Sequence, residues 1–169
     1  ALYSQTDTMG WQKGALGSLN FSQTALVNWA EGGENSITGT ALLGLFAKYR
    51  SKLTYWYNTL DLAYGLTGID FDDVRKNDDN IDFITSYCRY AFGKFYYSGL
   101  LNFKSQFAPG YTYPNDTDVV SRFLAPGYLT VAAGLTWSPK KYFSLFFTPI
   151  SGRFTFVTDE ELSNTGAYG

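Results

Sequence analysis

The sequence predicts an all-β fold, an antiparallel up-and-down β-barrel, and three observations support this prediction. Apolar and polar residues alternate with a period of two along segments of about ten residues or more, which is typical of strands with one apolar face. Short and long connections alternate between these segments. Aromatic residues make up 19% of the 169 residues, although the mean hydropathy is slightly negative.

Seven segments carry this alternation and are predicted to be strands. In residues 37–49, for example, Leu43 and Leu45 lie on one face and Lys48 lies on the other. Asn58 is a polar residue on the apolar face of the third segment, and the pattern does not explain it. The predicted strands are residues 13–23, 37–49, 53–67, 82–94, 95–107, 128–138 and 142–148.

The connections differ in charge as well as in length. Of the fifteen acidic residues, all but Asp7 and Asp61 lie in or beside the long connections, while the short turns are basic. Short turns at one end and long loops at the other are typical of outer-membrane barrels, whose short turns face the periplasm. The short connections are residues 50–52, 93–94 and 138–141, and the long ones are residues 24–35, 68–81, 108–127 and 151 onward.

Alternation alone does not tell which face of the sheet is inside, and a soluble barrel of the lipocalin type is the alternative. The strand lengths, the long loops at one end and aromatic residues gathered near the short turns favour a transmembrane barrel. We expect an apolar face toward lipid and an aromatic girdle near the turns. The predicted lipid-facing residues are Leu43, Leu45, Leu101, Phe103, Val131 and Leu135, and the predicted girdle is Tyr49, Trp56, Tyr90, Tyr97, Trp137 and Phe143.

Spaced motifs over nearly the whole chain resemble a family of uncharacterised proteins of the Bacteroidota, a domain of unknown function thought to form an outer-membrane barrel. The resemblance implies a location in the bacterial outer membrane, and it implies further strands beyond the seven in this chain, which we expect to form one domain over residues 1–169. The motifs are NFSQTALVNWAEGGENS (20–36), WYNTLDLAYG (56–65), RKNDDNID (75–82), FKSQFAPGYTYP (103–114) and SRFLAPGYLTVAAGLTWSP (121–139).

The residue types limit the chemistry that this chain can perform. There is no histidine, so a histidine general base is excluded, and we predict no enzymatic activity, no cofactor and no metal. A net charge of −2 argues against nucleic acid as a partner. The acidic residues 69–82 offer oxygen ligands for Ca²⁺, but a solvated loop is the simpler interpretation because the glycine of an EF-hand loop is missing.

Four polar residues of the predicted strands, Asp61, Arg89, Lys104 and Gln106, are expected to face the lumen. They would either line a water-filled channel or form an ion-pair network that plugs a narrow barrel. The expected partners are outer-membrane lipid and other outer-membrane proteins. The expected role is structural or that of an accessory subunit in a larger outer-membrane complex; the alternatives are a passive channel for small solutes and a soluble ligand-binding barrel.

Overall fold

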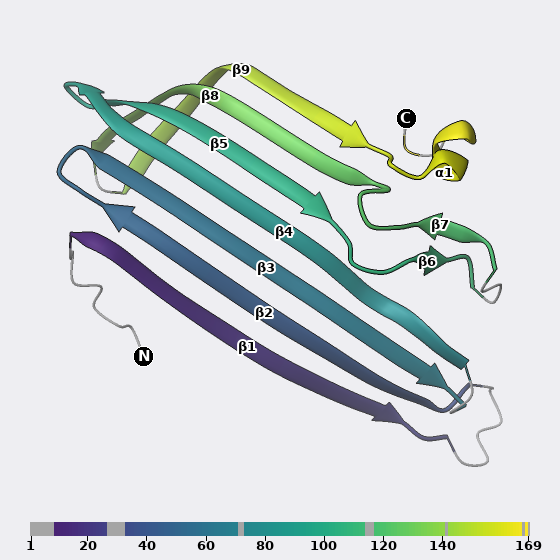
Figure 1. Cartoon of the computed structure of the whole chain (residues 1–169). Coiled ribbons are helices and arrows are strands. Elements are labelled where there is room, and N and C mark those ends of the chain that lie inside the picture. The colour runs from purple at the N-terminus through teal and green to yellow at the C-terminus, as the bar shows by residue number, and fades with distance from the viewer. Residues whose placement is uncertain are drawn as a thin grey trace.

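The chain is an all-β protein with one short helix, as shown by a computed structural model that describes residues 9–26, 33–70, 73–113, 117–140, 142–166 and 168 (Figure 1). The main sheet is antiparallel and has seven strands in the order β1-β2-β3-β4-β5-β8-β9. These strands are β1 (Gly10–Thr24), β2 (Ser36–Arg50), β3 (Thr54–Ile69), β4 (Asp73–Phe92), β5 (Phe95–Ser105), β8 (Gly127–Lys140) and β9 (Phe143–Phe156).

The remaining elements lie in the connections at the end of the sheet away from the short turns. Strands β6 (Gly110–Tyr111) and β7 (Val119–Ser121) form a small separate hairpin between β5 and β8. Helix α1 (Glu160–Asn164) follows β9 and is capped at its N-terminus by Asp159, whose carboxylate accepts a hydrogen bond from the backbone N–H of Leu162. No helix in the described ranges is long and apolar enough to cross a membrane.

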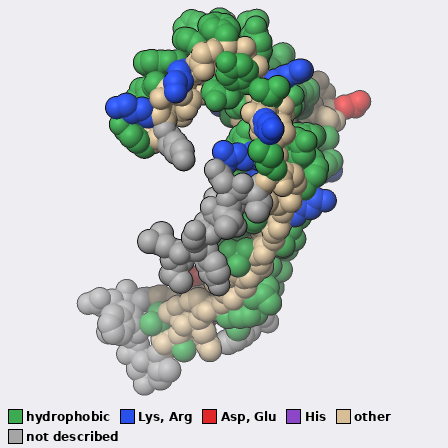
Figure 2. All heavy atoms as spheres, turned by 90° about the vertical axis from the view of Figure 1, so that its left-hand side faces the viewer, with side chains coloured by type: hydrophobic (Ala, Val, Ile, Leu, Met, Phe, Trp, Pro, Cys, Tyr) green, Lys and Arg blue, Asp and Glu red, His purple; other side chains and the backbone are tan. Residues whose placement is uncertain are grey.

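The sheet is a single curled layer. Figure 2 looks at the short-turn end and shows a hook whose outer side carries many of the hydrophobic side chains. Among the described residues, only Ala125 and Leu162 are buried hydrophobic residues, and both lie in the far-end connections. The described part of the chain therefore lacks the hydrophobic core between two layers that soluble domains use.

Crowding of side chains distinguishes the concave face from the convex one. A Cβ atom added at Gly44, which shares a face with Asp61, would lie 3.2 Å from the Asp61 carboxylate. A Cβ atom at Gly17, on the other face, would meet nothing within 4 Å. The face that carries Gly44 and Asp61 is therefore the inner one, and the apolar face that carries Leu43 is convex.

The sheet does not close into the predicted barrel. Within the described residues, β1 and β9 each pair with a single neighbour, so the sheet is open at both edges. Small barrels close with about eight strands, and the seven strands described here are one fewer. The prediction of antiparallel strands is confirmed, and a closed barrel is not found.

The structure differs from the predicted strands and loops at three places. Strand β4 begins at Asp73 inside the predicted acidic loop, because a bulge at Gly65/Leu66 lets residues 73–76 pair with the end of β3. Strand β9 continues to Phe156, beyond the predicted end at residue 148. The third predicted loop, residues 108–127, contains the β6–β7 hairpin.

Gly134 occupies a bulge where β8 and β9 come close together, and its replacement by alanine is expected to destabilise the sheet. An added Cβ would overlap the backbone carbonyl of Phe147, which cannot move away as a flexible side chain can. We expect Gly134→Ala to lower the free energy of unfolding by about 1–3 kcal/mol in urea denaturation.

The matched control for this prediction is Gly99→Ala. An added Cβ at Gly99 comes no closer than 3.8 Å to the carbonyl oxygen of Ala132, which is an ordinary contact. The control should change the free energy of unfolding by less than about 1 kcal/mol. Equal effects of the two substitutions would contradict the close approach of β8 and β9.

Candidate functional site

The middle of the convex face is mostly apolar in every strand of the sheet, and its charged residues lie toward the two ends of the strands. Residues that are directly opposite each other in a ladder share a face, and Leu43 is opposite Leu62 while Leu101 is opposite Val131. Following the pairing from β2 to β8 places all six predicted lipid-facing residues on this one face. Leu43 and Leu45 are 40% and 36% exposed, so no other part of the described chain covers them.

Aromatic rings gather on the convex face next to the short turns. The ring of Trp11 lies 5.3 Å from that of Tyr49 and 5.6 Å from that of Trp56, and Trp56 is 6.4 Å from Tyr87. Trp11 and Tyr87 were not in the predicted girdle, although their positions follow from pairing with Tyr49 and Trp56.

The other predicted girdle residues are divided between the two faces. Trp137 and Phe143 lie in contact, with ring centroids 6.0 Å apart, and Tyr97 is on the convex face. Tyr90 is opposite Tyr96 in the ladder. Each is next in sequence to a residue of the convex face, Arg89 or Tyr97, so both lie on the concave face. The aromatic residues near the turns therefore lie on both faces of the sheet.

Asn58 is accommodated on the apolar face by a chain of hydrogen bonds. The indole N–H of Trp56 donates to the hydroxyl of Thr85 over 2.8 Å, and that hydroxyl donates to Asn58 Oδ1 over 2.7 Å. The amide of Asn58 donates to the backbone carbonyl of Ala47 over 3.2 Å. These hydrogen bonds give partners to polar atoms on an otherwise apolar surface. Such partners are required because a polar atom removed from water without a hydrogen bond is destabilising.

The four polar residues that were predicted to share the lumen are not brought together. Asp61 and Lys104 lie on the concave face, where each is opposite Asp82 in the ladder. Arg89 lies on the convex face opposite Thr54. Gln106 follows the end of β5 and donates to the carbonyl of Ala108 over 3.2 Å.

Asp82 is the centre of the polar cluster on the concave face. Lys104 Nζ lies 2.8 Å from one of its carboxylate oxygens, and the amide of Asn102 donates to the other. The sequence pattern assigned Asp82 to the boundary of an acidic loop and did not indicate its contact with Asn102. The pairing of β4 with β5, which brings these side chains together, has no signal in the sequence beyond the alternation itself.

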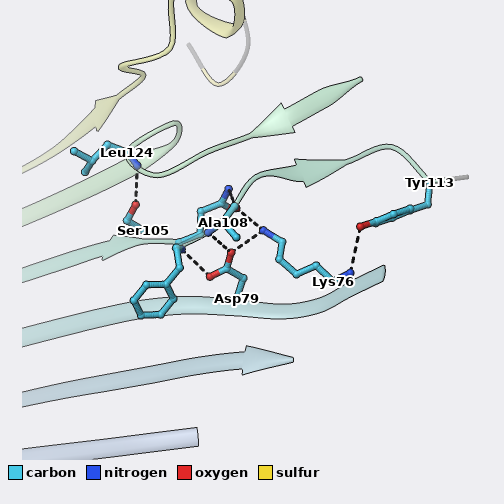
Figure 3. Close-up of polar contacts among 8 residues, drawn as sticks. Lys76, Asp79, Ser105, Ala108, Tyr113 and Leu124 are labelled. Carbon is cyan, nitrogen blue, oxygen red and sulfur yellow. Dashed lines mark hydrogen bonds and ion pairs between the residues drawn. The ribbon is translucent and has the colours of Figure 1, made fainter. Parts of the chain in front are cut away.

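A second polar cluster joins the far end of β4 to the connection that follows β5 (Figure 3). The carboxylate of Asp79 accepts hydrogen bonds from the backbone N–H of Phe107 over 2.7 Å and of Ala108 over 2.9 Å. Lys76 Nζ donates to Asp79 and to the carbonyl of Ala108, both over 2.7 Å. The Asp79 side chain is only 3% exposed, so this ion pair is shielded from solvent.

Two further contacts hold the same connection in place. The backbone N–H of Lys76 donates to the phenol oxygen of Tyr113 over 3.2 Å, and the backbone N–H of Leu124 donates to the hydroxyl of Ser105 over 3.0 Å. Figure 3 shows that these partners come from β4, from the end of β5 and from the connection on either side of β6 and β7. The connection is thus fastened to the sheet at both of its ends.

The environment of Asp79 lowers the pKa of its carboxyl. Burial by itself raises this pKa, but the hydrogen bonds from Lys76 and from the backbone N–H groups of Phe107 and Ala108 outweigh the effect of burial. The carboxylate therefore stays charged to a lower pH than an ordinary aspartate. Its contribution to stability is present at neutral pH and is lost as the pH falls through the lowered pKa.

The acidic segment that offered ligands for Ca²⁺ is mostly strand, and its carboxylates have protein cations as partners. Arg75 Nε donates to Asp73 over 2.8 Å, and Lys76 and Lys104 are paired with Asp79 and Asp82. Across the residues that the structure describes, no group of three or more His, Cys, Asp or Glu side chains is arranged to hold a metal ion.

Thr85→Val is expected to destabilise the sheet, because it leaves the indole N–H of Trp56 and Oδ1 of Asn58 without their shared partner. The expected loss is about 1–3 kcal/mol of the free energy of unfolding, measured by urea denaturation. Thr59→Val is the control, since the Thr59 hydroxyl makes no hydrogen bond to another described residue. A loss as large in the control would argue against the hydrogen-bond chain.

Asp79→Asn is expected to release the connection after β5. Hydrogen bonds to a charged group contribute about 1.5–3 kcal/mol, so exchange of the Phe107 and Ala108 amide hydrogens should quicken roughly tenfold or more. In the unmodified protein these amides should stay protected until the pH falls below the usual pKa range of aspartate. Asp61→Asn is the control, because Asp61 forms no ion pair with another described residue, and it should leave both amides unchanged.

The comparisons with known proteins identify a family and nothing more specific. A family model described as a protein of unknown function (DUF3078) matches residues 21–111, which include all of β2, β3, β4 and β5. No curated protein and no solved structure matches the chain. The matched residues contain both polar clusters and amount to more than half of the 169 residues. The chain belongs to the DUF3078 family of proteins of unknown function.

Proposed function

We propose that this chain forms the greater part of the wall of a bacterial outer-membrane β-barrel, with its convex face toward lipid. The proposed role is structural or that of an accessory subunit in an outer-membrane complex. The observation that carries the proposal is the uncovered convex face, whose middle band is mostly apolar from β1 to β9. Soluble proteins rarely expose a continuous apolar surface of more than a few hundred Å².

The dimensions of the strands support a membrane setting. The seven strands of the sheet contain between 11 and 20 residues, and a tilted strand needs about 9–11 residues to cross a bilayer. The rings of Trp11, Tyr49 and Trp56 would lie at one interface, where aromatic side chains with a polar tip are favoured. The part of β4 before Ile81 extends beyond its pairing with β5, so Asp79 and Lys76 would lie outside the bilayer.

The direction of the curl favours this proposal over a soluble ligand-binding barrel. A soluble barrel turns its apolar face inward around its ligand. Here the apolar residues are on the convex side, and the charged group of Asp61, Asp82 and Lys104 is on the concave side. Shallow hollows on the convex face, such as one of about 460 Å³ lined by Phe21, Gly39 and Tyr64, would be filled by acyl chains.

The fastened connections at the far end favour a structural or accessory role. Asp79 holds the connection before β6. The ion pair of Arg122 with Asp159, at 3.3 Å, joins the residue after β7 to the start of α1, and the hydroxyl of Tyr168 donates to the carbonyl of Val120 in β7. Ordered connections of this kind present a fixed surface to another protein. A passive channel is the second candidate, and the polar concave face of Asp61, Asp82 and Lys104 favours it.

Spin labels at two neighbouring residues test the orientation of the sheet. Leu42 and Leu43 are each 40% exposed and lie at the same height on opposite faces. In vesicles, a label at Leu43→Cys should be relaxed by oxygen and protected from a water-soluble nickel complex. The label at Leu42→Cys should be protected from oxygen. Both variants would carry Cys88→Ser, so that only the introduced thiol reacts.

Two outcomes of this experiment would contradict the proposal: equal access of the nickel complex to both labels, or oxygen relaxation greater at Leu42 than at Leu43.

The channel is tested separately by conductance across a planar bilayer. Steady unitary currents would establish a channel. The absence of current from a correctly inserted protein would favour the structural or accessory role.

A further inference from the structure

Strand β1 forms one open edge of the main sheet (Figure 1). Its 15 residues pair with β2 from one end to the other, and no bulge interrupts the register. Alternate residues of an edge strand direct their N–H and C=O groups away from the strand with which it pairs. Among the described residues, no second strand receives these groups along residues 13–24. This edge therefore presents a regular row of backbone donors and acceptors.

The sequence of β1 lacks the features that keep an open edge from pairing with another strand. Natural proteins protect such an edge with charged residues, with proline or with a bulge. Residues 14–24 contain no charged residue and no proline, and their register with β2 is regular. The opposite edge differs, because β9 contains Pro149 and its register against β8 is shifted by bulges. The unprotected edge of this sheet is therefore β1.

Large apolar side chains on β1 are far more exposed than those on the neighbouring strand. Leu16, Leu19 and Phe21 are 76%, 70% and 79% exposed, whereas Leu42 and Leu43 of β2 are each 40% exposed. Leu19 and Phe21 lie on the convex face, and Leu16 lies on the concave face. Side chains directly opposite each other on neighbouring strands are about 4.5–5.5 Å apart at Cβ. A strand added beside β1 would therefore cover apolar side chains on both faces.

Gly17 leaves room at this edge for a large side chain of an added strand. A Cβ atom placed at Gly17 meets nothing within 4 Å. An aromatic ring on a neighbouring strand can cover a glycine of this kind. The ladder between β1 and β2 already contains one example, since Phe21 is opposite Gly39 and its ring lies 3.6 Å from a Cβ placed there. The same arrangement is open to a partner at Gly17.

We propose that the open edge of β1 docks one antiparallel strand of a partner protein. The occupant is a polypeptide, because only a polypeptide repeats donors and acceptors at the spacing of the edge. Its apolar residues face the convex side and alternate with polar ones, and an aromatic ring lies opposite Gly17. The antiparallel direction is that of every ladder in the main sheet.

In the proposed membrane setting, a partner protein fits this edge better than a second copy of the chain. Two copies inserted in the same direction have parallel β1 strands. The seven antiparallel strands also give β1 and β9 the same direction, so β1 of one copy and β9 of another are parallel. Neither arrangement continues the antiparallel sheet. The choice of a partner over a second copy rests on the proposed function, whereas the open edge does not.

A synthetic peptide with the predicted pattern is the probe for this edge. It has about eleven residues, in which leucine and threonine alternate, with phenylalanine at the central apolar position and lysine at each end. We expect one peptide to bind per purified chain in a nonionic detergent. Amide exchange should then slow about tenfold or more at alternate residues of β1. Amides of β2, which pairs on both sides, should not change.

The direction of docking is read from a nitroxide at the N-terminus of the peptide. Antiparallel docking places this label near the end of β1, so it should broaden the amide resonance of Ser22 more than that of Lys13. The opposite pattern would overturn the antiparallel direction. No binding of the unlabelled peptide would overturn the proposal as a whole.

Two N-methylated peptides distinguish pairing at the edge from general attraction to an apolar surface. Methylation of every second residue removes the N–H groups from one edge of the peptide and leaves its side chains unchanged. One set of alternate residues faces β1 and the other faces away. We expect one methylated peptide to bind about tenfold or more weakly and the other to bind within about threefold of the parent. Equal affinities of the two would overturn the proposal.

The ring opposite Gly17 is tested by a pair of substitutions. Exchange of the central phenylalanine of the peptide for alanine should weaken binding to the unmodified chain about threefold or more. In the variant Gly17→Val, whose side chain fills the space, the two peptides should bind equally. The same loss in both chains would overturn the assignment of the ring to Gly17.

Two further results separate this proposal from the membrane setting and from a dimer. The peptide experiment needs no lipid, so peptide binding with the reverse result of the spin labels at Leu42 and Leu43 would overturn the membrane setting alone. Correct spin-label results without peptide binding would overturn the docking proposal alone. A dimer whose alternate β1 amides are protected before the peptide is added would assign the edge to a second copy and overturn the proposal.

Discussion

The unbroken antiparallel ladder from β1 to β9 is the constraint on which the other features of this protein depend. With no second layer against the described sheet, the backbone hydrogen bonds and the side-chain pairs across neighbouring strands hold it together. A shift of one residue in any ladder would exchange the two faces of a strand. The pairing of Leu43 with Leu62 and of Asp82 with Lys104 keeps apolar side chains outside and charges inside.

Bulges in this ladder create the local sites. Residues three apart in a regular strand point to opposite faces, yet Lys76 and Asp79 reach the same side because the bulge opposite Gly65 lies between them. The ion pair that fastens the connection after β5 therefore depends on this irregularity. The bulges between β8 and β9 increase the local twist, and Ser144 of β9 comes to line the same part of the concave face as Arg50 of β2.

The sequence alone was enough to locate the seven strands of the main sheet, because apolar residues recur in them with a period of two. It was insufficient to assign the faces of β4, where Phe83 and Tyr87 on one face and Ile84 and Cys88 on the other make both faces partly apolar. Arg89 was consequently grouped with Asp61 and Lys104, although the register separates them. The hydrogen bonds of Asn58 and of Asp79 join residues far apart in the sequence, and alternation carries no information about such partners.

The order of the strands has a consequence for folding. Neighbours in the sheet are also neighbours along the chain, except where β6 and β7 intervene between β5 and β8. Low contact order favours rapid folding, because each hairpin closes a short loop before the next strand is added. The step from β5 to β8 closes the longest loop, so it should be the slowest pairing in the sheet. Contacts such as Ser105 with Leu124 shorten that loop and would speed this step.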